Sequence, residues 1–334
     1  MEIKIRQNIN GKYLPIILAV LSVICAFLGG LVGDILVALS GAILALVFLV
    51  DGTKIRLWFV LSSAAIIATN VAIDIYFGAL VSVYSLEVIA IALIIALCFK
   101  LGVSKAVTAG ILTVALSLFI LLGLYLSGAA SAGSFLLEDV IRFYSEYAAK
   151  LQEMLEAELA AIMERYSEQL GASGMTEVDY VSTLVLSLKR SLLSVLIVIS
   201  FALSGIALKM FSLVCVSVSE DTKPILRWRF ITSNTFAYFY IAVFFLGAFL
   251  SASDDALALT VATLNTVLMF VYAYIGFGVC RAMLRRRFSG IMSFIVLILA
   301  MLLLSSLAVQ VLSILGVFTV INVNKAAKGN GESK

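Results

Sequence analysis

The sequence contains no histidine. This absence excludes catalytic triads and metal sites built on histidine, and it removes the commonest general acid-base group. The sequence also lacks a Gly-x-x-x-x-Gly-Lys-Ser/Thr loop, so the chain cannot bind a nucleotide as P-loop proteins do. Any work driven by ATP would therefore need a partner. We expect a protein that is not an enzyme and that carries no cofactor and no metal ion.

Proline, cysteine and charged residues are scarce. The two prolines, Pro15 and Pro224, lie at the ends of apolar runs, where they do not interrupt a helix. The four cysteines lie singly along the chain, with a spacing that predicts neither a disulfide nor a zinc site. Charged residues make up 13% of the chain and apolar residues 63%, against about 25% and about 45–50% in soluble domains. This composition excludes a soluble fold.

Nine long apolar runs, each near the length of about 20 residues that crosses a bilayer, account for this composition. Long runs without alternation or turn signals predict helices rather than the strands of a barrel. We therefore predict an all-α fold, a polytopic helical membrane protein with eight or nine transmembrane helices. Eight stays open because the second run is short and the last continues to Ile321. The runs are Leu14 to Gly33, Ile35 to Val50, Leu57 to Phe77, Tyr84 to Phe99, Ala106 to Leu126, Leu192 to Val218, Ile231 to Leu250, Ala256 to Val279 and Ile291 to Leu312.

Most of the 23 Lys and Arg residues lie in the N-terminus and in every second gap between the runs. The opposite gaps contain cations only in one long insert. By the positive-inside rule, this pattern predicts a multi-pass protein of the cell membrane with its N-terminus in the cytoplasm. Nine spans would leave the tail, with Lys325 and Lys328, outside, whereas eight spans would place it inside.

Two of the predicted cytoplasmic loops are strongly basic. Orientation signals and anchoring to lipid headgroups explain them, although a docking face for a cytoplasmic partner would use the same residues. Nothing beyond charge points to nucleic acid, so we do not expect it as a partner. The basic residues are Lys223, Arg227, Arg229, Arg281, Arg285, Arg286 and Arg287.

The runs divide the chain into an N-terminal membrane half of five helices (1–127), an insert (128–189), a C-terminal membrane half of about four helices (190–321) and a polar tail (322–334). Ten acids and four bases make the insert acidic. An apolar stripe from Leu137 to Tyr166 predicts one helix, and a break at Gly171 to Gly174 ends it. Thr176 and Asp179 have the spacing of a capping box, which predicts a second helix that continues into the sixth run. We expect an external helical hairpin whose stripe is its own core; a partner-binding or lid role is the alternative.

A few polar residues lie inside the runs. Asn70 and Asp74 are four residues apart, hence on one face of the third helix, and Glu87 and Asn265 lie in the fourth and eighth helices. All four fall in the outer half of the predicted membrane. Ionisable groups within a membrane are costly and indicate a pathway or site, so these residues are our candidate ligand-binding site. The alternative is that the two acids lie at the membrane interface and the asparagines bond neighbouring helices.

Ser22, Ala26 and Gly30 recur every fourth residue in the first run. Small side chains at this spacing let another helix approach closely. Packing inside the protein and docking against a partner's transmembrane helix both use such a stripe.

The order of features along the chain resembles that of a known family. A short second run ends in a charged turn with glycine, Asp51 to Lys54, and the apolar stretch from Ser85 to Leu97 leads into a basic turn, Lys100 to Lys105. An external insert, four runs and a closing Leu315 to Val317 follow. From residue 14 to about residue 324, the chain resembles the YybS-like family of predicted multi-pass membrane proteins, a domain of unknown function.

That family is distantly similar to the S components of energy-coupling factor transporters, which bind vitamins or related small molecules and depend on partner ATPases. The resemblance implies a small-molecule binding or transport subunit that needs an energising module. It also implies that the small-residue stripe faces a membrane protein partner and that the outer polar residues bind the ligand. A membrane scaffold that holds partners through its acidic hairpin or its basic loops is the second functional hypothesis.

Overall fold

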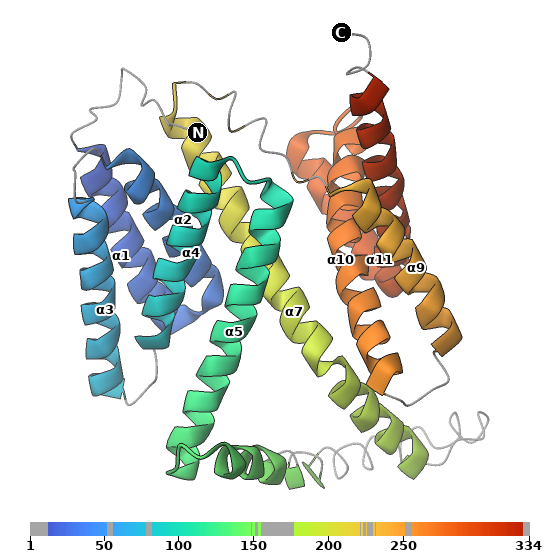
Figure 1. Ribbon diagram of the computed structural model, residues 1–334, viewed down its shortest axis with the longest axis horizontal. Helices are drawn as coiled ribbons and strands as arrows, with labels where there is room; N and C mark the ends of the chain where they lie inside the picture. Colours follow the sequence, from blue (N-terminus) through green and yellow to red (C-terminus); the bar gives the residue numbers. More distant parts are fainter. Residues whose placement is uncertain are drawn as a thin grey trace.

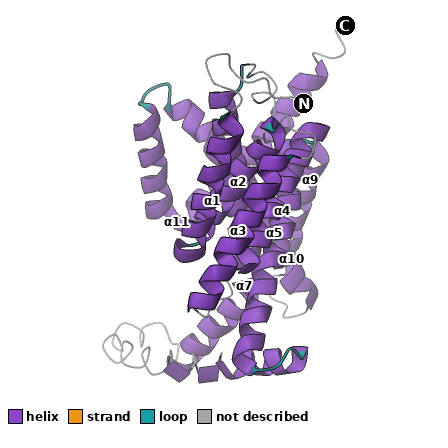
Figure 2. Ribbon diagram, turned by 90° about the vertical axis from the view of Figure 1, so that its left-hand side faces the viewer, coloured by secondary structure: helices purple, strands orange, loops and turns teal. Residues whose placement is uncertain are grey.

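The computed structural model describes residues 13–51, 56–77, 82–147, 149–150, 153–154, 177–220, 222, 225, 230, 232–250 and 256–329. Within these ranges the chain forms α-helices and no β-strand (Figures 1 and 2). The predicted all-α fold is therefore confirmed. The helices are α1 (Leu14–Val32), α2 (Asp34–Val50), α3 (Leu57–Phe77), α4 (Ser82–Leu101), α5 (Lys105–Ala132), α7 (Glu177–Val218), α9 (Asn234–Leu250), α10 (Ala256–Leu284) and α11 (Gly290–Gly329).

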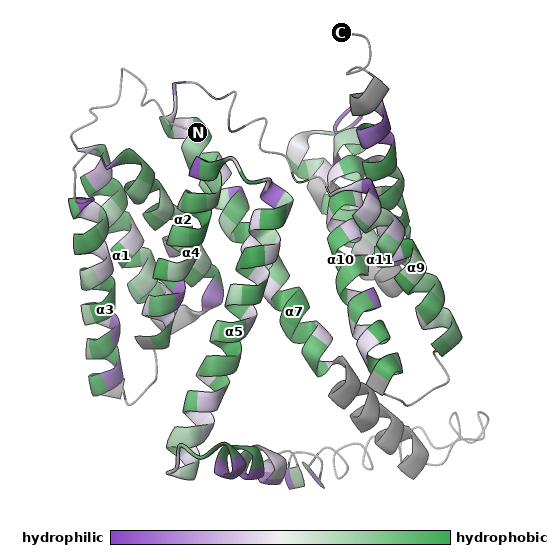
Figure 3. Cartoon of the chain, in the orientation of Figure 1, coloured by the Kyte–Doolittle hydropathy of each residue, from purple (hydrophilic) through white to green (hydrophobic). Residues whose placement is uncertain are grey.

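Within the described residues, six segments are long and apolar enough to cross a membrane, and most of their residues are apolar (Figure 3). Four further apolar segments are shorter: Leu14–Gly30, Asp34–Val50, Asn234–Leu250 and Gly290–Ala300. The total of eight or nine spans therefore remains a prediction. The six are Leu57–Tyr76, Val83–Leu101, Lys105–Ala132, Ser191–Val218, Leu257–Leu284 and Leu307–Lys325.

The N-terminal helices pack around α2. This helix contacts α1, α3, α4 and α7, and its residues from Val37 to Val47 are almost all buried. A helix that is apolar on every side suits such a central position. At Gly41 the absence of a side chain lets Ile91 of α4 approach, because a Cβ there would lie 2.6 Å from Ile91 Cγ2. The short second apolar run therefore forms the buried central helix of the N-terminal membrane half.

The helix after the insert agrees with its predicted start. The capping-box spacing predicted a helix from about Thr176 into the sixth run, and α7 is one helix of 42 residues from Glu177. The apolar stripe beyond residue 154 and the Gly171 to Gly174 break lie outside the described residues. The external hairpin therefore remains a prediction.

A second group consists of α9, α10 and α11, and it meets the first group through contacts of α10 with α7. Phe201 of α7 packs edge-on against Tyr274 of α10 at 6.0 Å between ring centroids. Within the group α9 and α10 are antiparallel, since Tyr240 stacks on Tyr272 at 5.0 Å and Gly247 lies beside Asn265. The start of α9 and the end of α10 are consequently on the same side of the molecule.

The last helix also ends on that side. Asn324 Nδ2 donates to the Thr232 carbonyl at 3.0 Å and to Asn234 Oδ1 at 2.8 Å, so residue 324 lies at the start of α9. A straight α11 of 40 residues would extend about 60 Å away from the end of α10. The chain therefore reverses direction between the apolar segments Gly290–Ala300 and Leu307–Lys325. We predicted one final run, but its second part returns and brings the tail to the side of the arginine-rich turn after α10.

Cysteine labelling tests this reversal. In a variant whose four native cysteines are alanine, Ser289→Cys and Lys325→Cys should react with a membrane-impermeant maleimide from the same side of the membrane. Both positions are exposed. Glu138→Cys, on the exposed segment after α5, should react from the opposite side. Labelling of positions 289 and 325 from opposite sides would show that α11 crosses only once.

Candidate functional site

Glu87 is a buried carboxylate in an apolar helix. It lies near the start of α4, in the spanning segment Val83–Leu101, and only 4% of its surface is exposed. No cation of the described residues pairs with it. Burying an ionised carboxylate without a partner is costly, so the group must hold a proton or meet a cation that is not among the described residues.

A second carboxylate, that of Asp34, influences Glu87 electrostatically. Asp34 is the first residue of α2, and both carboxylates act on the Tyr84 hydroxyl. The turn between α1 and α2 places it there: Gly33, at φ 130°, ends α1 and donates its N–H to the Gly29 carbonyl at 2.8 Å. Two nearby carboxylates of like charge in a region of low polarity favour the binding of one positive charge between them. Asp34 was not among the predicted site residues; an acid directly after glycine at the start of the short second run was the available signal.

Asn70 lies on the other side of α4. Its Nδ2 donates to Ser85 Oγ at 2.9 Å, and the Ser85 hydroxyl lies 3.4 Å from the Ile66 carbonyl. Asn70 is fully buried, yet its Oδ1 accepts no hydrogen bond. Because residues two apart on a helix point in different directions, Ser85 and Glu87 face different neighbours. Asn70 and Glu87 therefore lie at similar depth on separate sides of α4.

Because Asn70 Oδ1 is buried without a hydrogen bond, we predict that replacing Asn70 by an apolar residue costs little stability. Asn70→Leu removes one hydrogen bond of about 0.6 kcal/mol, a typical value within membranes, and also removes a buried acceptor that has no donor. We expect the unfolding midpoint in detergent to change little or to rise. Asn324→Leu is the comparison, because the Asn324 amide donates two hydrogen bonds that hold α11 against α9. A larger loss of stability at Asn70 than at Asn324 would contradict this interpretation.

The remaining candidate ligand-binding residues are Asp74 on α3 and Asn265 on α10. Asp74 is half-buried near the end of α3, where it has an interaction of its own. Asn265 lies in α10, which packs on α7, α9 and α11 rather than on α3 or α4 (Figure 1). Its Oδ1 is buried without a hydrogen bond, like that of Asn70. The structure therefore does not bring Asn265 together with the candidate residues of α3 and α4, because shared depth in a membrane does not bring two helices together.

The small-residue stripe is used inside the protein. Ser22 and Ala26 are almost fully buried, and the Ser22 carbonyl accepts a hydrogen bond from Ser40 Oγ of α2 at 2.8 Å. Gly30 is partly exposed at the end of α1. The face that the resemblance assigned to a transmembrane partner is therefore occupied by α2.

Of the two basic loops, the structure describes only the one after α10. Arg281 is half-buried, whereas Arg285, Arg286 and Arg287 form an exposed turn before α11. Lys223, Arg227 and Arg229 lie outside the described residues. The exposed arginines suit headgroup anchoring and a docking face equally well.

Comparison with known proteins found no match: no family model, no curated protein and no solved structure is similar to this chain. Within the described residues, no group of three or more Cys, Asp or Glu side chains is placed to hold a metal ion.

Proposed function

We propose that the chain is an integral protein of the cell membrane that binds a small cationic solute at Glu87. The observation that carries the proposal is a carboxylate with 4% exposure, within a spanning helix, that has no cationic partner among the described residues and that a second carboxylate, Asp34, influences electrostatically. Intramembrane acids of this kind are costly to keep and serve substrate or ion pathways. Asp34 and Glu87 supply the negative charge, and the Tyr84 hydroxyl supplies a neutral hydrogen-bonding group.

The site lies at one end of the helix bundle. Asp34 begins α2 and Glu87 is near the start of α4, at the end opposite the turn after α10 with its three arginines (Figure 1). If the positive-inside rule holds, the arginine side and the N-terminus are cytoplasmic, and the site opens outward. Because the sequence lacks a P-loop, transport against a gradient would need a membrane partner or an energising module. The resemblance to S components points to the same arrangement.

The scaffold hypothesis has less support. It depends on the acidic insert, which lies largely outside the described residues, and on basic loops that headgroups also explain. Solute binding is the function that the burial of Glu87 supports.

A thermal-stability screen tests the proposal. The purified protein in mild detergent would be heated with sodium, potassium, ammonium or small organic amines, each at matched ionic strength. A ligand at about 100 times its Kd stabilises the native state by about 2.7 kcal/mol, so one class of cation should raise the unfolding midpoint by several degrees. Glu87→Gln should lose this shift, while the exposed-acid variant Glu138→Gln keeps it. Equal responses of both variants to every cation would refute binding at Glu87.

A further inference from the structure

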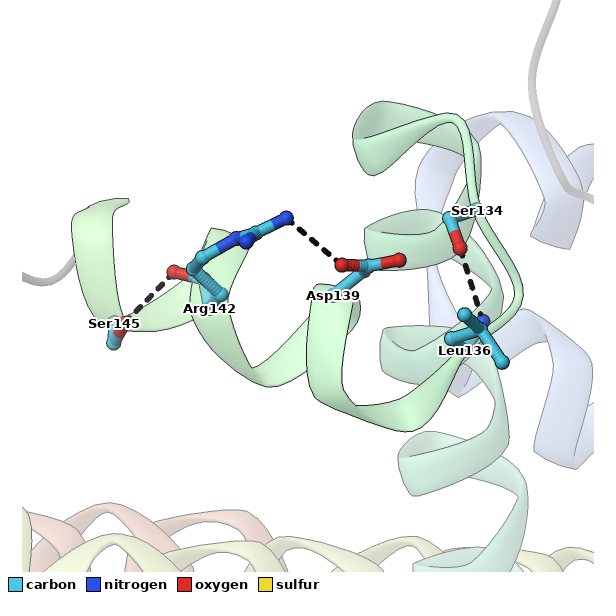
Figure 4. A network of polar contacts seen from close by, with 5 residues as sticks. All are labelled: Ser134, Leu136, Asp139, Arg142 and Ser145. Atoms are coloured by element: carbon cyan, nitrogen blue, oxygen red, sulfur yellow. Dashed lines mark hydrogen bonds and ion pairs between the residues drawn. The ribbon is translucent and has the colours of Figure 1, made fainter.

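The segment that follows α5 is a helix that crosses the end of α5. Gly133, at φ 66°, ends α5, and the Ser134 N–H donates to the Ala129 carbonyl at 3.2 Å. Ser134 Oγ then accepts from the Leu136 N–H at 3.2 Å, and a helix runs over residues 137–147 (Figure 4). Figures 1 and 2 both show this helix at the lower end of α5, across the direction of the long helices.

One ridge of this helix, formed by Val140 and Tyr144, packs against α5. Val140 is buried, and Tyr144 Oη donates to the Leu124 carbonyl at 2.6 Å. Gly128 provides the space, since a Cβ there would lie 2.8 Å from Val140 Cγ1 and 2.5 Å from Tyr144 Cε2. Tyr125 Oη also donates to the Phe135 carbonyl in the turn. In the described part, the predicted stripe residue Tyr144 thus packs on α5 and not on a second hairpin helix.

Both flanks of that ridge are apolar and exposed. At about 100° per residue, Leu137 and Ile141 lie on one side of the ridge, and Phe143 and Tyr147 lie on the other. Leu137 is 62% exposed, Ile141 58% and Tyr147 57%. The turn before the helix adds Phe135 and Leu136, at 73% and 68%. Exposed apolar side chains on both sides of the contact with α5 indicate a surface that another molecule buries.

The opposite face is polar throughout. Glu138, Asp139, Arg142 and Glu146 occupy it, and Arg142 pairs with Asp139 at 2.8 Å (Figure 4). Ser145 Oγ donates to the Arg142 carbonyl at 2.7 Å on the same side. A broad apolar face and a charged face on one short helix are typical of segments that lie in the plane of a membrane surface.

We propose that residues 135–147 lie in the lipid headgroup layer around the end of α5, with both apolar flanks inserted between acyl chains. The position follows from the chain itself: the helix starts five residues after Ala132, where the spanning segment Lys105–Ala132 ends, and it crosses that segment. Tyr144 and Tyr147 are suited to this depth, because tyrosine prefers the interface between membrane and water. Three acids against one Arg in residues 137–147 favour zwitterionic lipid over an anionic surface.

Depth-dependent quenching of tryptophan fluorescence tests the proposal. The full chain, with Trp58 and Trp228 changed to phenylalanine, would carry Ile141→Trp or Leu137→Trp on the apolar flank, or Ser145→Trp on the polar face. Each variant would be reconstituted into phosphatidylcholine vesicles with brominated lipids or with aqueous acrylamide. We expect brominated lipid to quench positions 137 and 141 several-fold more than position 145, and acrylamide to show the opposite order.

Two results would overturn the proposal. Acrylamide quenching of all three positions without lipid quenching would place the helix in water. Protection of positions 137 and 141 from both quenchers would mean that protein covers the apolar flanks. Having two flank variants guards against the failure of one to fold, and size-exclusion chromatography identifies such a failure.

Discussion

Gly276→Leu should abolish the close packing of α10 against α11 and leave little folded protein. A Cβ at Gly276 would lie 1.9 Å from the Leu312 carbonyl oxygen, and a Cβ at Gly316 would lie 2.0 Å from the Tyr272 carbonyl oxygen. Both atoms belong to helix backbones, which cannot move aside as a flexible side chain can. Overpacking costs about 1–3 kcal/mol where side chains can adjust, and we expect at least the upper end of that range here.

Gly278→Leu is the matched control. Gly278 lies on the same helix two residues away, and a Cβ there would meet no atom within 4 Å. Fluorescence-detected size exclusion should therefore show a single folded peak for Gly278→Leu and the native chain, and aggregation or loss of the peak for Gly276→Leu and Gly316→Leu. Normal peaks and unfolding midpoints for both of the latter would show that the two backbones do not touch.

Glu87→Gln should weaken the binding of the cationic solute by tenfold or more. A hydrogen bond or ion contact to a charged group contributes about 1.5–3 kcal/mol, which corresponds to a factor of about 10 to 150 in Kd. Glutamine keeps the size of the side chain and loses only the charge, so the fold should persist. Asp34→Asn should act in the same direction but less strongly, because Asp34 lies at the helix end. Titration of the purified variants with the cation found in the stability screen measures these effects.

Asn70→Leu separates the two sides of α4. Since Ser85 and Glu87 face different neighbours, this change should leave cation binding at Glu87 intact. A loss of binding would show that one site extends around α4 and includes the Asn70 oxygen.

The sequence predicted where helices lie but not how they meet. Runs such as Leu57 to Phe77 and the spacing of Thr176 and Asp179 placed helix ends well, because hydropathy and capping are local properties. The electrostatic influence of Asp34 on Glu87 depends on the contact of α2 with α4, which no local pattern encodes. For the same reason, the shared depth of Asn70 and Asn265 did not reveal that their helices belong to different groups.

The sequence also did not predict which glycines make close contacts between helices. The stripe of Ser22, Ala26 and Gly30 was recognisable by its spacing, and α2 fills it. Gly276 and Gly316 are 40 residues apart in sequence and lie where the backbones of α10 and α11 come close together. They contact each other only because α11 reverses direction. The continuous apolar run to Ile321 gives no sign of this reversal.

Mass spectrometry of the small molecules that remain bound after purification in mild detergent tests the central claim most directly. The native chain, Glu87→Gln and Glu138→Gln would be purified in parallel from the same host and denatured to release their ligands. We predict a cationic molecule, near one per chain, in the native protein and in Glu138→Gln, and its loss from Glu87→Gln. Two results would contradict a solute site at Glu87. One is the same cation at equal amounts in all three proteins. The other is a native protein that retains no cation, whether or not cations were added during purification.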